Sequence, residues 1–432
     1  MISRLRPHIP SIVALGLRGS SLLAGFVITY FIGHRLGPAA NGQYALVTQT
    51  ALFLATVGLA GIDVGVVRHF TAAVGRKIPI ATETFVKVSG LALLLMIAIA
   101  VVLWFGGDLL WKPMFGHAVP QSAIGVLVVM LVGRGGTRLF GAILRSQHAF
   151  ILGQTLEVMV IPGVVAVAML LGFLRTPGAA LWVTAIISVV ATVAGIVACL
   201  RYCGSKGETL AVPMKKMLNS SIPLWGVYMS FSAVDWYTLA TAAAYLNATG
   251  AGLYRVAVQA AGLMQVISIS LYSIYPPRIS ASFHAGDLAW TGRLTRSAIR
   301  VSALCAAPIA VILLVFPSQL LSYIGPQFIA CTPIVRVLVV GQLINTLIGP
   351  SGMTLAMSGN ERVNLIVSLG GTGLMLMLAP LATKFGGLMG LAGCITSIMI
   401  LRNLVSVYFV SRLLGLNILT GRVRPVLRLK QA

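Results

Sequence analysis

The apolar and polar positions divide the chain into long apolar runs, separated by short segments rich in Pro, Gly and charged residues. A helix needs about 20 mostly apolar residues to cross the hydrocarbon core of a bilayer. Runs that meet this length fall at 11–32, 43–67, 85–106, 121–144, 150–173, 179–200, 222–246, 253–276, 298–323, 332–357, 363–383 and 387–411. The sequence therefore predicts an all-α polytopic membrane protein with about 12 transmembrane helices and no room for a globular domain between them.

The composition agrees with this class of protein. Hydrophobic residues make up 58% of the 432 residues and charged residues only 9%, against about 25% in soluble domains. The mean hydropathy is +0.97, which excludes a soluble enzyme and a disordered chain. The formal charge of +23 does not indicate a nucleic-acid partner, because the basic residues are scattered between apolar runs and do not gather on one polar face.

The basic residues predict how the chain is oriented in the membrane. Of the 31 Lys and Arg residues, 21 fall in loops on one side of the predicted membrane and 4 on the other. Short cytoplasmic loops carry the excess of Lys and Arg in membrane proteins, so we expect both termini to be cytoplasmic. The five cysteines show no spacing typical of a disulfide framework, and we expect no metal site.

A weak internal repeat links the two halves of the chain at an offset of 210 residues. The segment 42–44 (Gly-Gln-Tyr) opens one apolar run, and the segment 252–254 (Gly-Leu-Tyr) opens the equivalent run. Arg68 and Arg278 close the same two runs at the same offset. An even number of spans in each half gives both halves the same orientation, related by an axis along the membrane normal.

The repeat predicts two parallel six-helix lobes around a central cavity, which is a transporter architecture. The expected domains are an N-terminal lobe over 1–200, a cytoplasmic linker over 201–221, a C-terminal lobe over 222–412 and a basic cytoplasmic tail over 413–432.

Three segments resemble a known family. The segments 35–38 (Arg-Leu-Gly-Pro) and 41–44 (Asn-Gly-Gln-Tyr), followed by an apolar run and Arg68, resemble the N-terminal signature of Wzx-type polysaccharide flippases of the MOP exporter superfamily. The segment 355–361 (Leu-Ala-Met-Ser-Gly-Asn-Glu) resembles the turn after span ten in these proteins. With 12 spans in two bundles, the resemblance covers nearly the whole chain.

The resemblance implies a bacterial inner-membrane flippase that works by alternating access. Its cargo would be an undecaprenyl-diphosphate-linked oligosaccharide for O-antigen, capsule or exopolysaccharide assembly, and a polysaccharide polymerase and other assembly proteins are candidate partners. We expect no cofactor, with a proton or sodium gradient as a candidate energy source. An ion-coupled multidrug or cation exporter of the same superfamily is the alternative, although spans one and ten lack the acidic residues common in those exporters.

A membrane polysaccharide polymerase is a further alternative, disfavoured because every outer loop is short. The chain has no phosphate-binding GxxxxGK[ST] motif, so we do not expect it to hydrolyse ATP or to be an enzyme.

Charged residues inside the apolar runs are the candidate functional residues, because a charge in the membrane usually faces a cavity or a partner. Six are positive and three are negative: Arg18, Asp63, Arg134, Arg138, Glu157, Asp235, Arg255, Arg336 and Arg402. The excess of +3 suits an anionic cargo such as a diphosphate, which a guanidinium binds through two parallel hydrogen bonds.

The positions of these residues along the runs predict pairs and cavity residues. Arg18 and Asp63 lie at a similar depth, so Arg18 either pairs with Asp63 or contacts cargo. Arg138 and Glu157 lie equally far from the turn between their runs, so we expect them to pair.

The cations left for cargo binding are Arg18, Arg134 and Arg255, and Asp235 is the candidate coupling or cavity acid near the middle of its span. We interpret Arg336 and Arg402 as interfacial.

Overall fold

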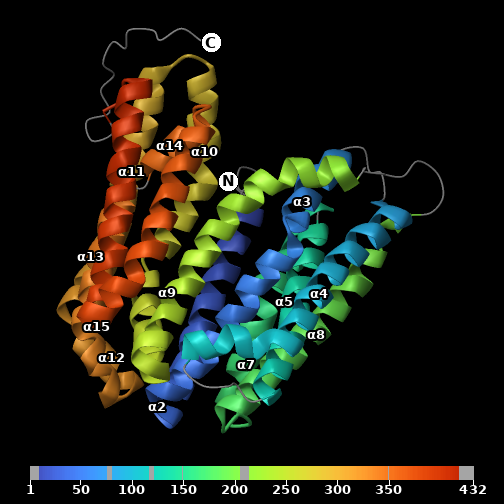
Figure 1. Ribbon diagram of the computed structural model, residues 1–432. Coiled ribbons are helices and arrows are strands. Elements are labelled where there is room, and N and C mark those ends of the chain that lie inside the picture. Colours follow the sequence, from blue (N-terminus) through green and yellow to red (C-terminus); the bar gives the residue numbers. More distant parts are fainter. Residues whose placement is uncertain are drawn as a thin grey trace. The chain divides into compact units, whose positions relative to one another are not determined.

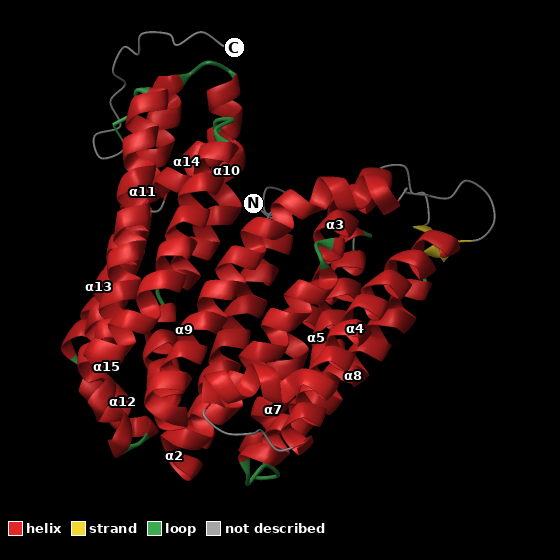
Figure 2. Ribbon diagram, viewed as in Figure 1, coloured by secondary structure: helices red, strands yellow, loops and turns green. Residues whose placement is uncertain are grey.

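The computed structural model describes residues 9–74, 80–115, 121–147, 149–204, 214–348 and 350–417, which are helical almost throughout (Figures 1 and 2). Contacts divide the chain into two compact units, Met1–Gly252 (unit 1) and Leu253–Ala432 (unit 2). The predicted all-α membrane fold is confirmed. The predicted tail beyond residue 417 and the linker residues 205–213 lie outside the described residues.

Unit 1 is built around a central helix that packs on most of the others. Its elements are α2 (Ile9–Leu59), α3 (Ile62–Val74), β1 (Ile80–Ala81), α4 (Thr82–Phe115), α5 (Gln121–Ser146), α6 (Phe150–Gln154), the π-helix η2 (Thr155–Met159), α7 (Val160–Leu170), α8 (Pro177–Leu200), β2 (Cys203–Gly204) and the first part of α9 (Met214–Gly262). Helix α5 contacts α2, α3, α4, α6, η2 and α8. Gly133 and Gly136 allow its backbone to approach Ser188 and Thr192 of α8 closely, as small residues do in membrane helix pairs.

A short parallel strand pair joins two ends of unit 1. Ile80 is in register with Cys203 and Ala81 with Gly204, so β1 and β2 connect the start of α4 to the end of α8 (Figure 2). This pair is the only sheet within the described residues.

Unit 2 contains the rest of α9 followed by α10 (Gln265–His284), α11 (Leu288–Val315), α12 (Pro317–Ile324), the 3-10 helix η3 (Pro326–Cys331), α13 (Thr332–Ile348), α14 (Pro350–Met357) and α15 (Glu361–Leu414). Its main apolar core is formed by residues of α9, α11, η3 and α13, with Phe328 and Cys331 fully buried.

Eight helices among the described residues are long and apolar enough to cross a membrane, fewer than the 12 predicted spans. Two of the eight, Gly16–Leu59 and Arg362–Leu414, each run through two predicted spans. The predicted spans 222–246 and 253–276 lie on α9 and α10, which are not among the eight. Polar residues such as Asp235 and Asn247 lower the hydropathy of α9, so length and composition alone do not identify it.

The long helices are interrupted at equivalent places in the repeat. Helix α2 is broken at Gly37 (φ 82°, ψ −179°) and α9 at Asn247 (φ 59°, ψ −174°), which is 210 residues later. Glycine adopts positive φ without strain, and Asn is among the side chains that tolerate it best. The side-chain oxygen of Asn247 accepts hydrogen bonds from the backbone N–H groups of Thr249 and Gly250, which helps the helix restart.

The two repeat segments also contact each other. A Cβ added at Gly42 would lie 1.9 Å from the Ala248 carbonyl oxygen, and one added at Gly252 would lie 1.9 Å from the Pro38 oxygen. Ala248 follows Pro38 by the same 210 residues, so the contact is reciprocal. We call the segments 38–42 and 248–252 the glycine contact. The repeat predicted from sequence is present here in both backbone conformation and packing.

A second recurrence appears inside each unit. In unit 1, the Thr192 hydroxyl donates to the Gly133 carbonyl oxygen at 2.8 Å and joins α8 to α5. In unit 2, the Thr396 hydroxyl donates to the Val337 carbonyl oxygen at 3.3 Å and joins α15 to α13. In each hydrogen bond the donor and the acceptor are 59 residues apart, so equivalent helix pairs in the two units are joined in the same way.

Candidate functional site

Three arginines lie along one stripe of α5. Arg134, Arg138 and Arg145 are separated by four and seven residues, spacings that return a helix to the same side. They extend over about 16 Å of the helix axis at 1.5 Å per residue. The charged site of unit 1 is therefore organised by α5, and the partners of each arginine come from the surrounding helices.

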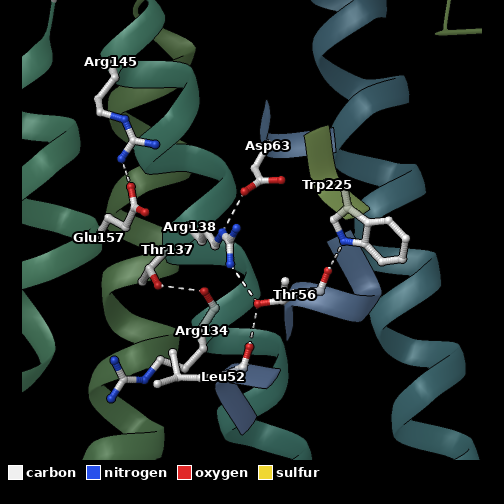
Figure 3. Close-up of polar contacts among 9 residues, drawn as sticks. All are labelled: Leu52, Thr56, Asp63, Arg134, Thr137, Arg138, Arg145, Glu157 and Trp225. Atoms are coloured by element: carbon white, nitrogen blue, oxygen red, sulfur yellow. Dashed lines mark hydrogen bonds and ion pairs between the residues drawn. The ribbon is translucent and has the colours of Figure 1, made fainter. Parts of the chain in front are cut away.

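Arg138 is held by a buried network (Figure 3). Its Nε donates to Asp63 Oδ2 at 2.7 Å, and its Nη1 donates to Thr56 Oγ1 at 2.8 Å. The Asp63 side chain is only 7% exposed and lies in the first turn of α3, where the helix dipole also favours a negative charge. The indole Nε1 of Trp225 on α9 donates to the Thr56 carbonyl oxygen at 2.7 Å, so Thr56 joins the ion pair to α9.

Arg145 forms a second ion pair, with Glu157 (Figure 3). Glu157 lies in η2, and π-helical turns are frequent at functional sites. The helices on either side of the turn approach closely, since a Cβ added at Gly153 would lie 2.5 Å from the Gly141 carbonyl oxygen. The pair therefore closes the α5–α6 hairpin.

The predicted pair between Arg138 and Glu157 is wrong, and of the two roles left open for Arg18, the pair with Asp63 is not formed. Asp63 pairs with Arg138 and not with Arg18, and Glu157 pairs with Arg145 and not with Arg138. Glu157 lies beside Gly141 of α5. Long side chains on a helix point back toward its N-terminus, so Arg145 reaches the level of Gly141 whereas Arg138 points away from it.

Arg18 belongs to the same electrostatic neighbourhood. It is exposed on α2, and within the described residues it has no ion pair to Asp63. Arg18, Arg138 and Asp63 all lie within electrostatic range of Arg145. Three arginines thus share this neighbourhood with two carboxylates, and the cluster keeps a positive excess.

Arg134 differs from its neighbours on α5, because its guanidinium has no ion pair or hydrogen bond in the part of the chain that the structure describes. Its Nε is buried without a partner, and Figure 3 shows the guanidinium directed away from Arg138. The Tyr44 side chain lies within electrostatic range, and its hydroxyl is 3.1 Å from Thr184 Oγ1. A buried guanidinium nitrogen that has no partner among the described residues is suited to receive an anion.

The remaining predicted site residues lie on α9. Asp235 is exposed and belongs to unit 1, whereas Arg255 is half-buried and belongs to unit 2. Next to Asp235, Trp236 is fixed to α2: its Nε1 donates to Thr50 Oγ1 at 3.0 Å, and its ring stacks on Phe53 with a centroid distance of 4.6 Å. The roles predicted for Asp235 and Arg255 stay predictions.

Three residues of this site were not among the sequence candidates. Arg145 was assigned to a loop, although its spacing from Arg138 on a helix gives a signal for it. Thr56 and Trp225 carry no such signal, because nothing in their local sequence indicates a partner more than a hundred residues away.

A separate polar group lies where α3 meets the start of α9. His69 Nε2 is 2.8 Å from Ser220 Oγ, and Arg68 donates to the Ser220 carbonyl oxygen at 3.3 Å. Partial burial lowers the pKa of His69 below its usual 6.5, and the nearby charges of Arg68 and Lys216 lower it further.

This lowered pKa predicts a pH dependence. The folded chain favours neutral His69, so its contribution to stability is complete above pH 6.5 and is lost as the pH falls through 6.5 toward the folded-state pKa. A His69→Gln variant is expected to lose less stability than the wild type between these pH values in thermal unfolding in detergent. His284, which is exposed on α10, provides the control substitution. Equal pH profiles for wild type and His69→Gln would contradict the prediction.

No family model and no curated protein matches the sequence. Solved structures match over nearly its whole length. One is a multidrug resistance MATE family transporter of the MOP superfamily in an inward-facing conformation, with a TM-score of 0.70, 16% identity and coverage of 95% of this chain and 97% of that chain. A MOP superfamily transporter from Pyrococcus furiosus, described as having a binding pocket of reverse polarity, has a TM-score of 0.61, 16% identity and 94% coverage of each chain.

The lipid II flippase MurJ, in an inward closed conformation, has a TM-score of 0.63 and 10% identity, with coverage of 93% of this chain and 87% of that chain. The chain therefore has the fold of MOP superfamily transporters, a multi-pass membrane fold that implies about 12 spans.

Proposed function

We propose that this protein is an inner-membrane flippase that moves an oligosaccharide linked to a polyprenyl diphosphate by alternating access between two lobes. The observation that carries the proposal is Arg134, a guanidinium within a membrane-spanning unit that has no counter-ion among the described residues. An uncompensated charge is costly inside a membrane unless a ligand or a cavity faces it. A diphosphate supplies the negative charge and the acceptor oxygens that a guanidinium binds.

The charge balance around α5 supports the same cargo. The carboxylates Asp63 and Glu157 are already paired, so they are not free to bind a cationic drug. Arg18 is exposed beside these pairs and offers a further positive charge. We expect Arg255 to contribute from unit 2, and Asp235 to take part in coupling to a proton or sodium gradient. Polysaccharide assembly proteins, a polymerase among them, are the expected partners.

The test is flipping of an undecaprenyl-diphosphate-linked oligosaccharide in proteoliposomes, followed by lectin access to the glycan. Arg134→Gln is expected to lower the flipping rate at least about tenfold, corresponding to about 1.4 kcal/mol of lost interaction with the diphosphate. Arg134→Lys keeps the positive charge but not the two parallel hydrogen bonds of a guanidinium. Its flipping rate should therefore lie between those of the wild type and Arg134→Gln. Arg336→Gln is the control, because Arg336 is exposed on α13 and its Nε donates to the Leu314 carbonyl oxygen.

An ion-coupled exporter of cationic drugs is the second candidate, favoured by the exposed carboxylate of Asp235 and by the fold shared with MATE transporters. Efflux of a cationic dye from the same proteoliposomes separates the two functions. Dye efflux that depends on Asp235, without flipping of the lipid-linked glycan, would refute the flippase proposal.

A further inference from the structure

An apolar groove runs along the outer side of α5, between α4 and α8. It encloses about 280 Å³ and is lined by Val86, Gly90 and Leu93 of α4, Phe140 of α5 and Ile196 of α8, among other residues. Both α4 and α8 pack on α5, which forms the floor. A water molecule takes about 30 Å³ in the liquid and a methylene group is of similar size, so the space holds roughly nine such groups.

The groove lies on the exposed side of a helix that can span a membrane, so we expect it to face lipid. Val86 is 59% exposed and Leu93 is 45% exposed on a helix that is long and apolar enough to span a membrane. The lining residues of α4 fall between positions 85 and 96, which corresponds to about 16 Å along the helix axis. This is about half of the 30 Å hydrocarbon thickness, so the groove has the depth of one leaflet. The β1–β2 pair joins α4 to α8 at the end of the groove near the start of α4.

One feature of the groove points to a chain with double bonds, and another leaves room for it. Ser89 Oγ is buried in the wall without a hydrogen-bond partner in the described part of the chain. A hydroxyl in an apolar site has a hydrogen to donate but no acceptor for it. The π electrons of a double bond are a weak acceptor, and a saturated chain has none. Gly90 leaves open space, because a Cβ added there would meet nothing within 4 Å.

We propose that this groove holds the isoprenoid chain of the lipid-linked cargo while the diphosphate is bound by the arginines of the transport path. The inference rests on the proposed function for the identity of the cargo. The groove would keep the hydrocarbon chain in the bilayer and against unit 1 during transport, so the polar head alone has to pass through the protein. Recognition is then divided between a chain site outside α5 and a head-group site at the cations.

Gly90→Leu adds a side chain in the groove with no clash at its Cβ, and Gly106→Leu is its matched control. Gly106 lies on the same helix, does not line the groove and also has nothing within 4 Å of an added Cβ. In proteoliposomes, Gly90→Leu is expected to raise the half-saturating concentration of the undecaprenyl-linked cargo about tenfold, because the chain loses its apolar burial. For the same glycan diphosphate on a short geranyl chain, Gly90→Leu should change the half-saturating concentration less than about twofold. Gly106→Leu should not change the half-saturating concentration of either cargo. Equal effects on both cargoes, or no effect, would overturn the proposal.

Photolabelling tests chain binding independently of transport. Undecaprenyl diphosphate carrying a diazirine on the chain is expected to label peptides containing residues 85–96 or 192–196 in the wild type and in Gly106→Leu, but not in Gly90→Leu. Labelling of the same peptides by a phosphatidylglycerol with a diazirine in its saturated acyl chain, at equal efficiency, would assign the groove to bulk lipid and overturn the inference. If wild-type protein flips neither cargo but the labelling result holds, the proposed function fails and the chain site stands.

Discussion

An Arg138→Met variant is expected to lose about 3–5 kcal/mol of folding stability, because it leaves Asp63 as a buried carboxylate without its counter-ion. The Thr56 hydroxyl also loses the hydrogen bond from Arg138 Nη1. Equilibrium unfolding in detergent measures this loss. We expect an accompanying loss of transport, since the same network connects α5 through Thr56 to Trp225 of α9.

The double variant Arg138→Met/Asp63→Leu separates the cost of an unpaired charge from the value of the pair. Replacing both members of a buried ion pair with apolar residues is often neutral, so most of the stability should return. Arg336→Met, at an exposed arginine of α13, should change stability by less than about 0.5 kcal/mol. A double variant as unstable as the single one would show that Arg138 stabilises the protein by packing and not by neutralising Asp63.

Gly42→Val is expected to destabilise the protein by about 3 kcal/mol or more and to abolish transport. The new Cβ would lie 1.9 Å from the backbone oxygen of Ala248, and a backbone atom cannot move aside as a flexible side chain does. Gly19→Val, also on α2, has nothing within 4 Å of the added Cβ and should not destabilise the protein, because valine has a higher helix propensity than glycine. Thermal unfolding and the flipping assay provide the measurements.

The glycine contact also predicts that Gly252→Val lowers stability and transport as much as Gly42→Val does. The single variants Gly42→Ala and Gly252→Ala should not be additive, because the backbone displacement caused by one makes room for the other. Additive losses in the double alanine variant would mean that the two glycines act at separate contacts.

The sequence predicted helices better than it predicted contacts. Runs of about 20 apolar residues identify spans because the bilayer imposes that length, and the repeat was visible because the close approach at Gly42 and Gly252 admits only glycine. Hydropathy identifies α9 least well as a span, because polar residues that pack on α2 lower its hydropathy.

Ion-pair partners were harder to predict, for two physical reasons. Depth along a span fixes the level of a Cα, but a long arginine side chain reaches about one turn further, which is why Glu157 meets Arg145. Neutral partners such as Thr56 and Trp225 leave no trace in charge or periodicity, so only the folded chain brings them together. No acid follows Arg134 at helical spacing, and its buried Nε has no partner among the described residues, but its predicted role in the cavity stays a prediction.

The glycine contact has a consequence for the origin of the chain. Gly42 packs on Ala248 and Gly252, and Gly252 packs on Pro38 and Gly42, so each repeat presents the same patch to the other. A patch that is complementary to its own copy is the isologous interface of a symmetric homodimer. The contact is therefore the kind that two separate copies of a half-length ancestor would have formed, and fusion of the duplicated genes would have preserved it inside a single polypeptide.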